Sequence, residues 1–131
     1  TQRMLAILLA ATLTGSSCAV PSIVSVGVQS ATTNGAIKHY VVAVKVENEG
    51  SARQPGNLLQ SVDVFQAHTK VDQIGLQPLA PKRGETVTYA FDRSAEAGDG
   101  TTNLTFEIDT NGRAGAQVDC RTGNETYEIA V

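Results

Sequence analysis

After residue 20, short segments of the chain carry an apolar residue at every second position, and this pattern constrains the fold more than any other feature of the chain. In the segment 40–46 the alternate apolar positions are Tyr40, Val42, Val44 and Val46. A period of two places successive side chains on opposite faces of a strand, so that one face can be buried. No segment after residue 20 has the 3.6-residue period of a ten-residue helix. Seven strands are predicted, the fourth less regular than the others: 24–28, 40–46, 62–64, 71–76, 87–91, 104–108 and 127–131.

Turn-forming residues separate these segments. Gly and Asn adopt the positive φ angles that tight turns need, and Pro fixes one side of a turn. They occur at 33–35, 48–50, 81–84, 98–100, 111–112 and 123–124. The 131 residues are enough for one domain. The pattern therefore predicts an all-β fold, a seven-stranded antiparallel sandwich of two sheets, preceded by an apolar N-terminal segment.

The first nineteen residues differ from the rest of the chain. Arg3 precedes an apolar run that begins at Met4 and continues to Leu13, and small polar residues follow as far as Cys18. This order is typical of a secretory signal peptide, and the run is too short to span a bilayer. We predict a leader over 1–19, a sandwich domain over 20–131, and a secreted or cell-envelope location. A short helix that is retained and buried is the alternative.

The two cysteines, Cys18 and Cys120, are too few for a zinc cage and form no CxxC motif. Three fates of Cys18 stay open. A leader that ends at Ala19 would remove it. Lipidation would follow from Ser16-Ser17-Cys18, which resembles a bacterial lipobox, although Gly15 stands where an aliphatic residue is expected. A disulfide with Cys120 would suit an exported chain, provided the first and last strands run parallel at one edge of the sandwich.

Charge and motif content exclude several function classes. Ten Lys and Arg residues against thirteen Asp and Glu give a net charge of -3, and no basic run exceeds Lys82-Arg83. A nucleic-acid partner is therefore excluded. The chain has no G-x-S-x-G elbow, no HExxH helix and no cysteine with a histidine and an orienting asparagine. We predict no enzyme and no cofactor, with a secreted hydrolase as the least favoured alternative.

Metal-binding residues are sparse. His39 is predicted to face outward from its strand and His68 to lie in a turn, both as surface histidines without a partner at ligand spacing. The segment 109–112 is interpreted as a turn with Asx capping, because it lacks the further ligands of a calcium loop. A Ca²⁺ site is the alternative, and its oxygen ligands would come from Asp99, Asp109, Asn111 and Asp119.

Several short motifs carry a family resemblance. The segment 44–51, which reads VKVENEGS, resembles the V-x-V-x-N-x-G strand and turn of CARDB domains, the cell-adhesion-related domains found in bacteria. The segment 79–85 resembles their L-x-P-G turn, with Lys82-Arg83 standing between Pro81 and Gly84. The segment 123–127 resembles their last turn, with 120–122 in place of an expected acidic residue. Further matches are the opening 21–24 and the segment 106–111.

The resemblance covers 21–131 and implies an immunoglobulin-like or fibronectin-like sandwich that serves as an extracellular binding or spacer module. We accordingly predict a non-enzymatic binding or adhesion module of a bacterial envelope, with a protein or glycan partner and no membrane contact other than a lipid anchor. The alternative is a structural subunit that forms a homo-oligomeric surface filament through its apolar N-terminal segment. The predicted binding loop, which could equally be a plain connection between strands, is the longest polar insertion and contains Arg53, Gln54, Pro55 and Asn57.

Overall fold

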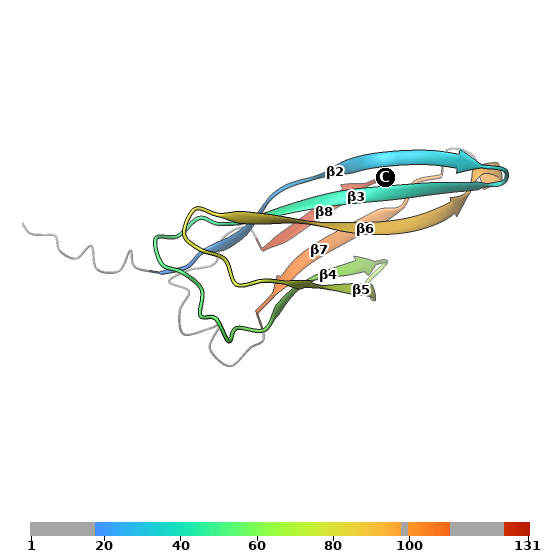
Figure 1. The fold of residues 1–131 in the computed structure, drawn as a ribbon. Coiled ribbons are helices and arrows are strands. Elements are labelled where there is room, and N and C mark those ends of the chain that lie inside the picture. Colours follow the sequence, from blue (N-terminus) through green and yellow to red (C-terminus); the bar gives the residue numbers. More distant parts are fainter. Residues whose placement is uncertain (1–17, 98–99, 111–124) are drawn as a thin grey trace, which may run out of the picture.

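Two antiparallel sheets form the fold (Figure 1). The structure is a computed structural model, and it describes residues 18–97, 100–110 and 125–131. One sheet has the order β2-β3-β6, and the other has the order β5-β4-β7-β8. This arrangement confirms the predicted all-β, seven-stranded sandwich. The strands are β2 (Pro21–Asn34), β3 (Ile37–Asn48), β4 (Gln60–Gln66), β5 (Thr69–Leu76), β6 (Gly84–Ser94), β7 (Asn103–Asp109) and β8 (Thr126–Ala130), with a 3-10 turn η3 at Ala95–Ala97.

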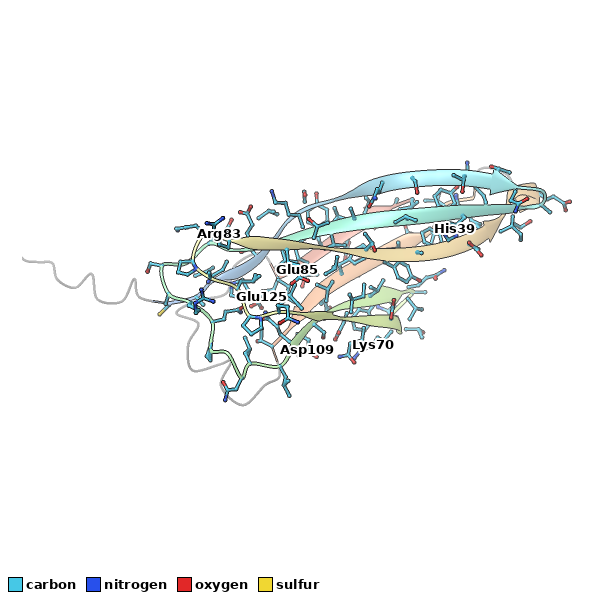
Figure 2. The ribbon with its side chains drawn as sticks, viewed as in Figure 1. His39, Lys70, Arg83, Glu85, Asp109 and Glu125 are labelled. Carbon is cyan, nitrogen blue, oxygen red and sulfur yellow. The ribbon has the colours of Figure 1, made fainter. Side chains whose placement is uncertain are left out.

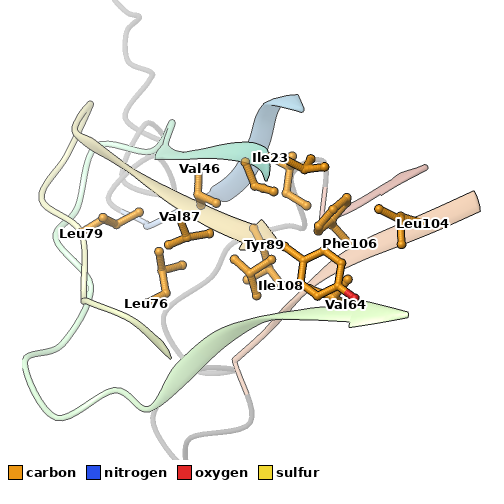
Figure 3. Close-up of a cluster of buried hydrophobic side chains, with 13 residues drawn as sticks. Ile23, Val46, Val64, Leu76, Leu79, Val87, Tyr89, Leu104, Phe106 and Ile108 are labelled. Atoms are coloured by element: carbon orange, nitrogen blue, oxygen red, sulfur yellow. The ribbon is translucent and has the colours of Figure 1, made fainter. Parts of the chain in front are cut away.

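The alternating apolar residues meet between the two sheets (Figure 3). Val42 and Val44 of β3 are fully buried, and so are Val64 of β4 and Phe106 of β7. Burying one such side chain stabilises the folded state by about 1.5–3 kcal/mol. Aromatic rings continue the packing, since Tyr89 lies edge-on to Phe106 with ring centroids 6.4 Å apart. The outward side chains of each strand are left to form the two outer faces.

The edge strand β2 departs from the predicted alternation at two bulges. Ile23 pairs with Val46 of β3 and the next pair is Ser25–Lys45, so Val24 is an extra residue in the strand. A second irregularity follows Val28. A bulge reverses the parity of the residues beside it, and Val24 is 36% exposed. Val24, an apolar residue of the segment predicted over 24–28, therefore does not face the core. Bulges of this kind also make an edge strand a poor template for pairing with other chains.

Arg93 of β6 joins the two sheets near the end of β8. Its guanidinium donates hydrogen bonds to Thr102 Oγ1 and to the Val131 carbonyl oxygen, both at 2.8 Å, and to the Tyr40 hydroxyl at 2.7 Å. The guanidinium also lies 4.8 Å from the centroid of the Tyr40 ring. The strands β2 and β8 are edge strands of opposite sheets and contact each other. The first and last strands therefore lie at one edge of the sandwich.

Candidate functional site

The predicted binding loop is only partly a surface feature. Gln54 is 1% exposed, and its side-chain amide exchanges two hydrogen bonds with that of Gln60, at 3.0 and 2.8 Å. Gln54 Oε1 also accepts a hydrogen bond from the Leu79 backbone N–H at 2.9 Å. The sequence prediction needs correction here, because Gln54 is buried and hydrogen-bonded to Gln60 and Leu79, so it holds the loop and cannot meet a partner. The other predicted contact residues reach the surface, with Arg53 and Asn57 exposed and Pro55 half-buried.

Asn48, the asparagine of the V-x-V-x-N-x-G segment, is buried at the junction of three chain segments. Its Oδ1 accepts hydrogen bonds from the backbone N–H groups of Val20 and Gly50, both at 2.9 Å. Its Nδ2 donates to the carbonyl oxygens of Ala52 at 2.8 Å and Leu79 at 3.2 Å. All hydrogen-bonding groups of this amide are used. Asn48 is therefore a structural residue that joins the start of β2 to two connecting loops.

Cys18 and Ala19 are packed into this same junction. The Cys18 carbonyl oxygen accepts a hydrogen bond from the Ala52 backbone N–H at 3.1 Å, and Ala19 is fully buried. Gly50 lets the backbone at Cys18 pack this closely against it, because a Cβ at position 50 would lie 2.0 Å from the Cys18 carbonyl oxygen. Cys18 is disulfide-bonded, while Cys120 lies outside the described residues. The pairing of Cys18 with Cys120 stays a prediction, and lipidation or removal of Cys18 would be incompatible with this disulfide.

Both histidines lie at the surface, as predicted from the sequence. His39 is an exposed residue of β3, and its Nδ1 lies 2.5 Å from the Asp92 Oδ1 of β6 (Figure 2). Sequence analysis missed this partner because Asp92 lies 53 residues further along the chain, beyond two strands that belong to the other sheet. His68 lies in the turn between β4 and β5.

Metal-ligand clusters are lacking in the described ranges. Within 18–97, 100–110 and 125–131, no group of three or more His, Cys, Asp or Glu residues is placed to hold a metal ion. Asp109 ends β7, whereas Asp99, Asn111 and Asp119 of the alternative Ca²⁺ site lie outside the described residues. Among the described residues, no helix is long and apolar enough to cross a membrane.

The outer face of the four-stranded sheet carries an open hollow of about 840 Å³. It lies over β7 and β8 and extends to the β4–β5 turn. Phe65, Thr105 and Glu128 form one row across β4, β7 and β8, and Glu107 lies beside Thr126 in the adjacent row. These side chains face away from the core because their strand neighbours face into it. We call this feature the sheet hollow and define it by Phe65, His68, Thr105, Glu107, Thr126 and Glu128.

Two irregular backbone features border the sheet hollow. Ala67 and His68, which form the β4–β5 turn, have φ angles of 51° and 68°. The left-handed region costs an L-residue with a side chain roughly 1–2 kcal/mol, and such strain is concentrated at functional sites. A bulge follows at Val71, since Val64 pairs with Asp72 but Phe65 pairs with Lys70. Bulges are also frequent beside functional sites.

Asp63 of β4 pairs with Glu107, in the same strand row as Thr126, although it does not itself line the sheet hollow. Its side chain is 5% exposed, accepts a hydrogen bond from the Ser61 hydroxyl at 2.6 Å and pairs with the Lys70 ammonium at 3.3 Å. Burial acts to raise the pKa of the Asp63 carboxyl, but the Ser61 hydroxyl, the Lys70 charge and the Asp109 side chain together outweigh it. The pKa therefore lies below its ordinary value of 3.8, and Asp63 is ionised at neutral pH. Figure 2 shows Lys70 and Asp109 on this part of the molecule.

The outer face of the four-stranded sheet is acidic. It carries the carboxylates of Asp63, Glu107, Asp109 and Glu128, against the ammonium of Lys70. Lys70 pairs with Asp63, and within the described part of the chain Glu107 and Glu128 form no ion pair. Two exposed carboxylates therefore line the sheet hollow without a counter-charge from these residues.

Comparisons with known proteins identify the fold. No family model matches the chain, and no curated protein matches it in sequence. Among solved structures, it is similar to the crystal structure of the CARDB domain of the PF1109 protein from Pyrococcus furiosus, a complex with di-metal ions. The match has 16% sequence identity and a TM-score of 0.57, and it covers 88% of this chain and 93% of that chain. The CARDB-like sandwich expected from the motifs is confirmed. The di-metal site belongs to that protein, since the described residues here provide no comparable cluster.

Proposed function

We propose that this chain is a non-enzymatic binding module, of the adhesion-related kind, that acts at the bacterial cell surface or after secretion. The sheet hollow is its binding face and a protein its partner. The observation that carries the proposal is the sheet hollow itself, an open acidic depression on a rigid sheet, bordered by a strained turn. The CARDB-like fold supports it, because such sandwiches serve binding and present their surfaces from a rigid scaffold. The envelope location rests on the leader-like segment 1–19.

The sheet hollow is a better candidate than the β3–β4 loop for a physical reason. In the loop, Gln54 is turned inward and the surface contribution comes from isolated exposed side chains. In the sheet hollow, Thr105 lies between Phe65 and Glu128 in a fixed strand register. Side chains on paired strands are held more precisely than those on loops, which lowers the entropy lost on binding.

The proposal is tested by blocking the hollow without changing charge. We would compare wild type with Thr105→Trp, which fills the hollow, and with Thr88→Trp, a matched change on the exposed outer face of the other sheet. Binding of the full chains to isolated envelope proteins of the producing cells is measured on a biosensor, with Tm confirming that both variants fold. Thr105→Trp is expected to weaken binding at least tenfold and Thr88→Trp to leave it unchanged. Equal binding by all three chains, or no binding by wild type, would contradict the proposal.

A further inference from the structure

We infer that the sheet hollow recognises a basic side chain, lysine or arginine, presented by an extended segment of the partner protein. This inference rests on the proposed function and names the chemistry of the partner. It begins from the two carboxylates that line the hollow, Glu107 and Glu128. Thr105 pairs with Glu128 and Glu107 pairs with Thr126, so the two glutamates are diagonal neighbours across β7 and β8. Diagonal neighbours in a sheet lie about 7–8 Å apart, a spacing that lets two carboxylates flank one cation.

The charge around these glutamates favours a cation and disfavours an anion. Both side chains are exposed and form no ion pair with any cation of the described residues. The lysine on this face, Lys70, is held by Asp63 at 3.3 Å. An approaching anion would meet uncompensated negative charge, whereas a cation would be drawn toward it. The same negative charge repels acidic partner surfaces, which would give the hollow selectivity as well as affinity.

Phe65 adds a second feature suited to a basic side chain. It is half-buried and lies in the same strand row as Thr105 and Glu128. An ammonium or guanidinium close to an aromatic ring gains a cation–π attraction, which persists at an exposed site. The aliphatic part of a lysine or arginine can pack on the same ring while its charge reaches the carboxylates. A metal ion would make no use of the ring.

The shape of the hollow favours an extended segment over a small amine. The depression is open, and it continues to β8, which is the edge strand of its sheet. An extended chain that lies on this face has alternate side chains that point toward the sheet. Such a segment would place one basic side chain between the glutamates and the hydroxyls of Thr105 and Thr126 beside its backbone.

The test uses a short peptide of alternating threonine and lysine, with counterparts in which glutamine or glutamate replaces lysine. Binding to the full chain is measured by isothermal titration calorimetry at two salt concentrations. We expect the lysine peptide to bind, binding to weaken with added salt, and the glutamate peptide not to bind. The double variant Glu107→Gln/Glu128→Gln is expected to weaken lysine-peptide binding by about three- to tenfold, from the usual strength of exposed ion pairs. Phe65→Leu should weaken it by about two- to fivefold.

Glu96→Gln is the matched control, because it removes an exposed carboxylate on η3 that is not among the residues lining the hollow. It should bind the lysine peptide as wild type does. Equal binding of the three peptides, or no effect of the double variant, would overturn the inference. If the envelope binding described above is lost in Thr105→Trp but kept in the double variant, the hollow binds a partner that is not basic. The inference then fails while the proposed function stands. If Thr105→Trp keeps envelope binding, the proposed function itself fails.

Discussion

At the scale of single residues, the polar side chains of the described structure divide into those that hold the fold and those that are available to a partner. Asn48, Gln54 and Asp63 are buried, and each is bonded to groups from distant segments. Glu107 and Glu128 are exposed on a regular strand face. Residue type alone does not separate the two groups, because a carboxylate is buried at Asp63 and exposed at Glu107 and Glu128.

Replacing Asn48 with Ala is expected to lower the free energy of unfolding by about 3 kcal/mol. The change leaves several buried backbone groups, those of Val20, Gly50 and Ala52 among them, without a hydrogen-bond partner. Urea unfolding followed by circular dichroism measures the loss. Asn57→Ala, at an exposed position of the same connection, is the control and should change stability by less than about 0.5 kcal/mol. Equal stability of the two variants would show that the Asn48 network is not needed.

Because Asp63 is ionised in the folded chain, the free energy of unfolding is expected to depend on pH in the acid range. Because its pKa is lower in the folded than in the unfolded chain, the folded state binds fewer protons in this range. The stabilisation is fully present above the ordinary Asp pKa of 3.8 and is lost as the pH falls from there through the folded pKa. Urea unfolding at pH 7 and at points below pH 4 would show the loss. Asp63→Asn should flatten the curve in this window, and an unchanged slope would contradict the assignment.

At the scale of elements, the strands were predictable and their irregularities were not. Alternation located all seven strands because one face of each must be buried. It could not reveal the β2 bulge at Val24, which changes parity without a marker residue. The fourth strand was less regular in sequence because β5 contains the bulge at Val71.

The sheet hollow was missed because Phe65, Thr105 and Glu128 come from three strands, and only their pairing brings them together. The aromatic Phe65, at an outward position beside Val64, was the available signal.

The β4–β5 turn gives a prediction at this scale. Ala67 has φ 51° without the side-chain hydrogen bonds that let asparagine tolerate this region. Ala67→Asn is expected to raise the free energy of unfolding by about 0.5–1 kcal/mol, because asparagine favours the left-handed region that two-residue hairpin turns require. The reverse change at Gly35, whose φ is 63°, provides the comparison: Gly35→Ala should destabilise by about 1 kcal/mol. Thermal unfolding of both variants measures these changes in the free energy of unfolding. A lower stability of Ala67→Asn than of wild type would contradict the inference that the backbone is strained at Ala67.

At the scale of the whole molecule, the buried junction around Asn48 and the proposed binding face are separate parts of the sandwich. Cys18 belongs to this junction, and the expected bridge to Cys120 would close most of the chain into one loop. On the loop-entropy model, reducing it would lower the free energy of unfolding by about 4–5 kcal/mol. Intact mass with and without reductant is expected to rise by two hydrogens, and Cys120→Ser should abolish that rise. A lipid mass on Cys18 in protein from its native cells would contradict the bridge.

The sandwich also places the two outer faces on opposite sides of one core, so a single experiment can tell which of them meets the partner. A photo-crosslinking residue is introduced at Thr105 in the sheet hollow, or at Thr88 on the outer face of β6, and the full chain is irradiated with envelope proteins. The account predicts a crosslinked partner from position 105 that is competed by the lysine peptide, and none from position 88. A partner crosslinked from position 88 and not from position 105 would contradict it.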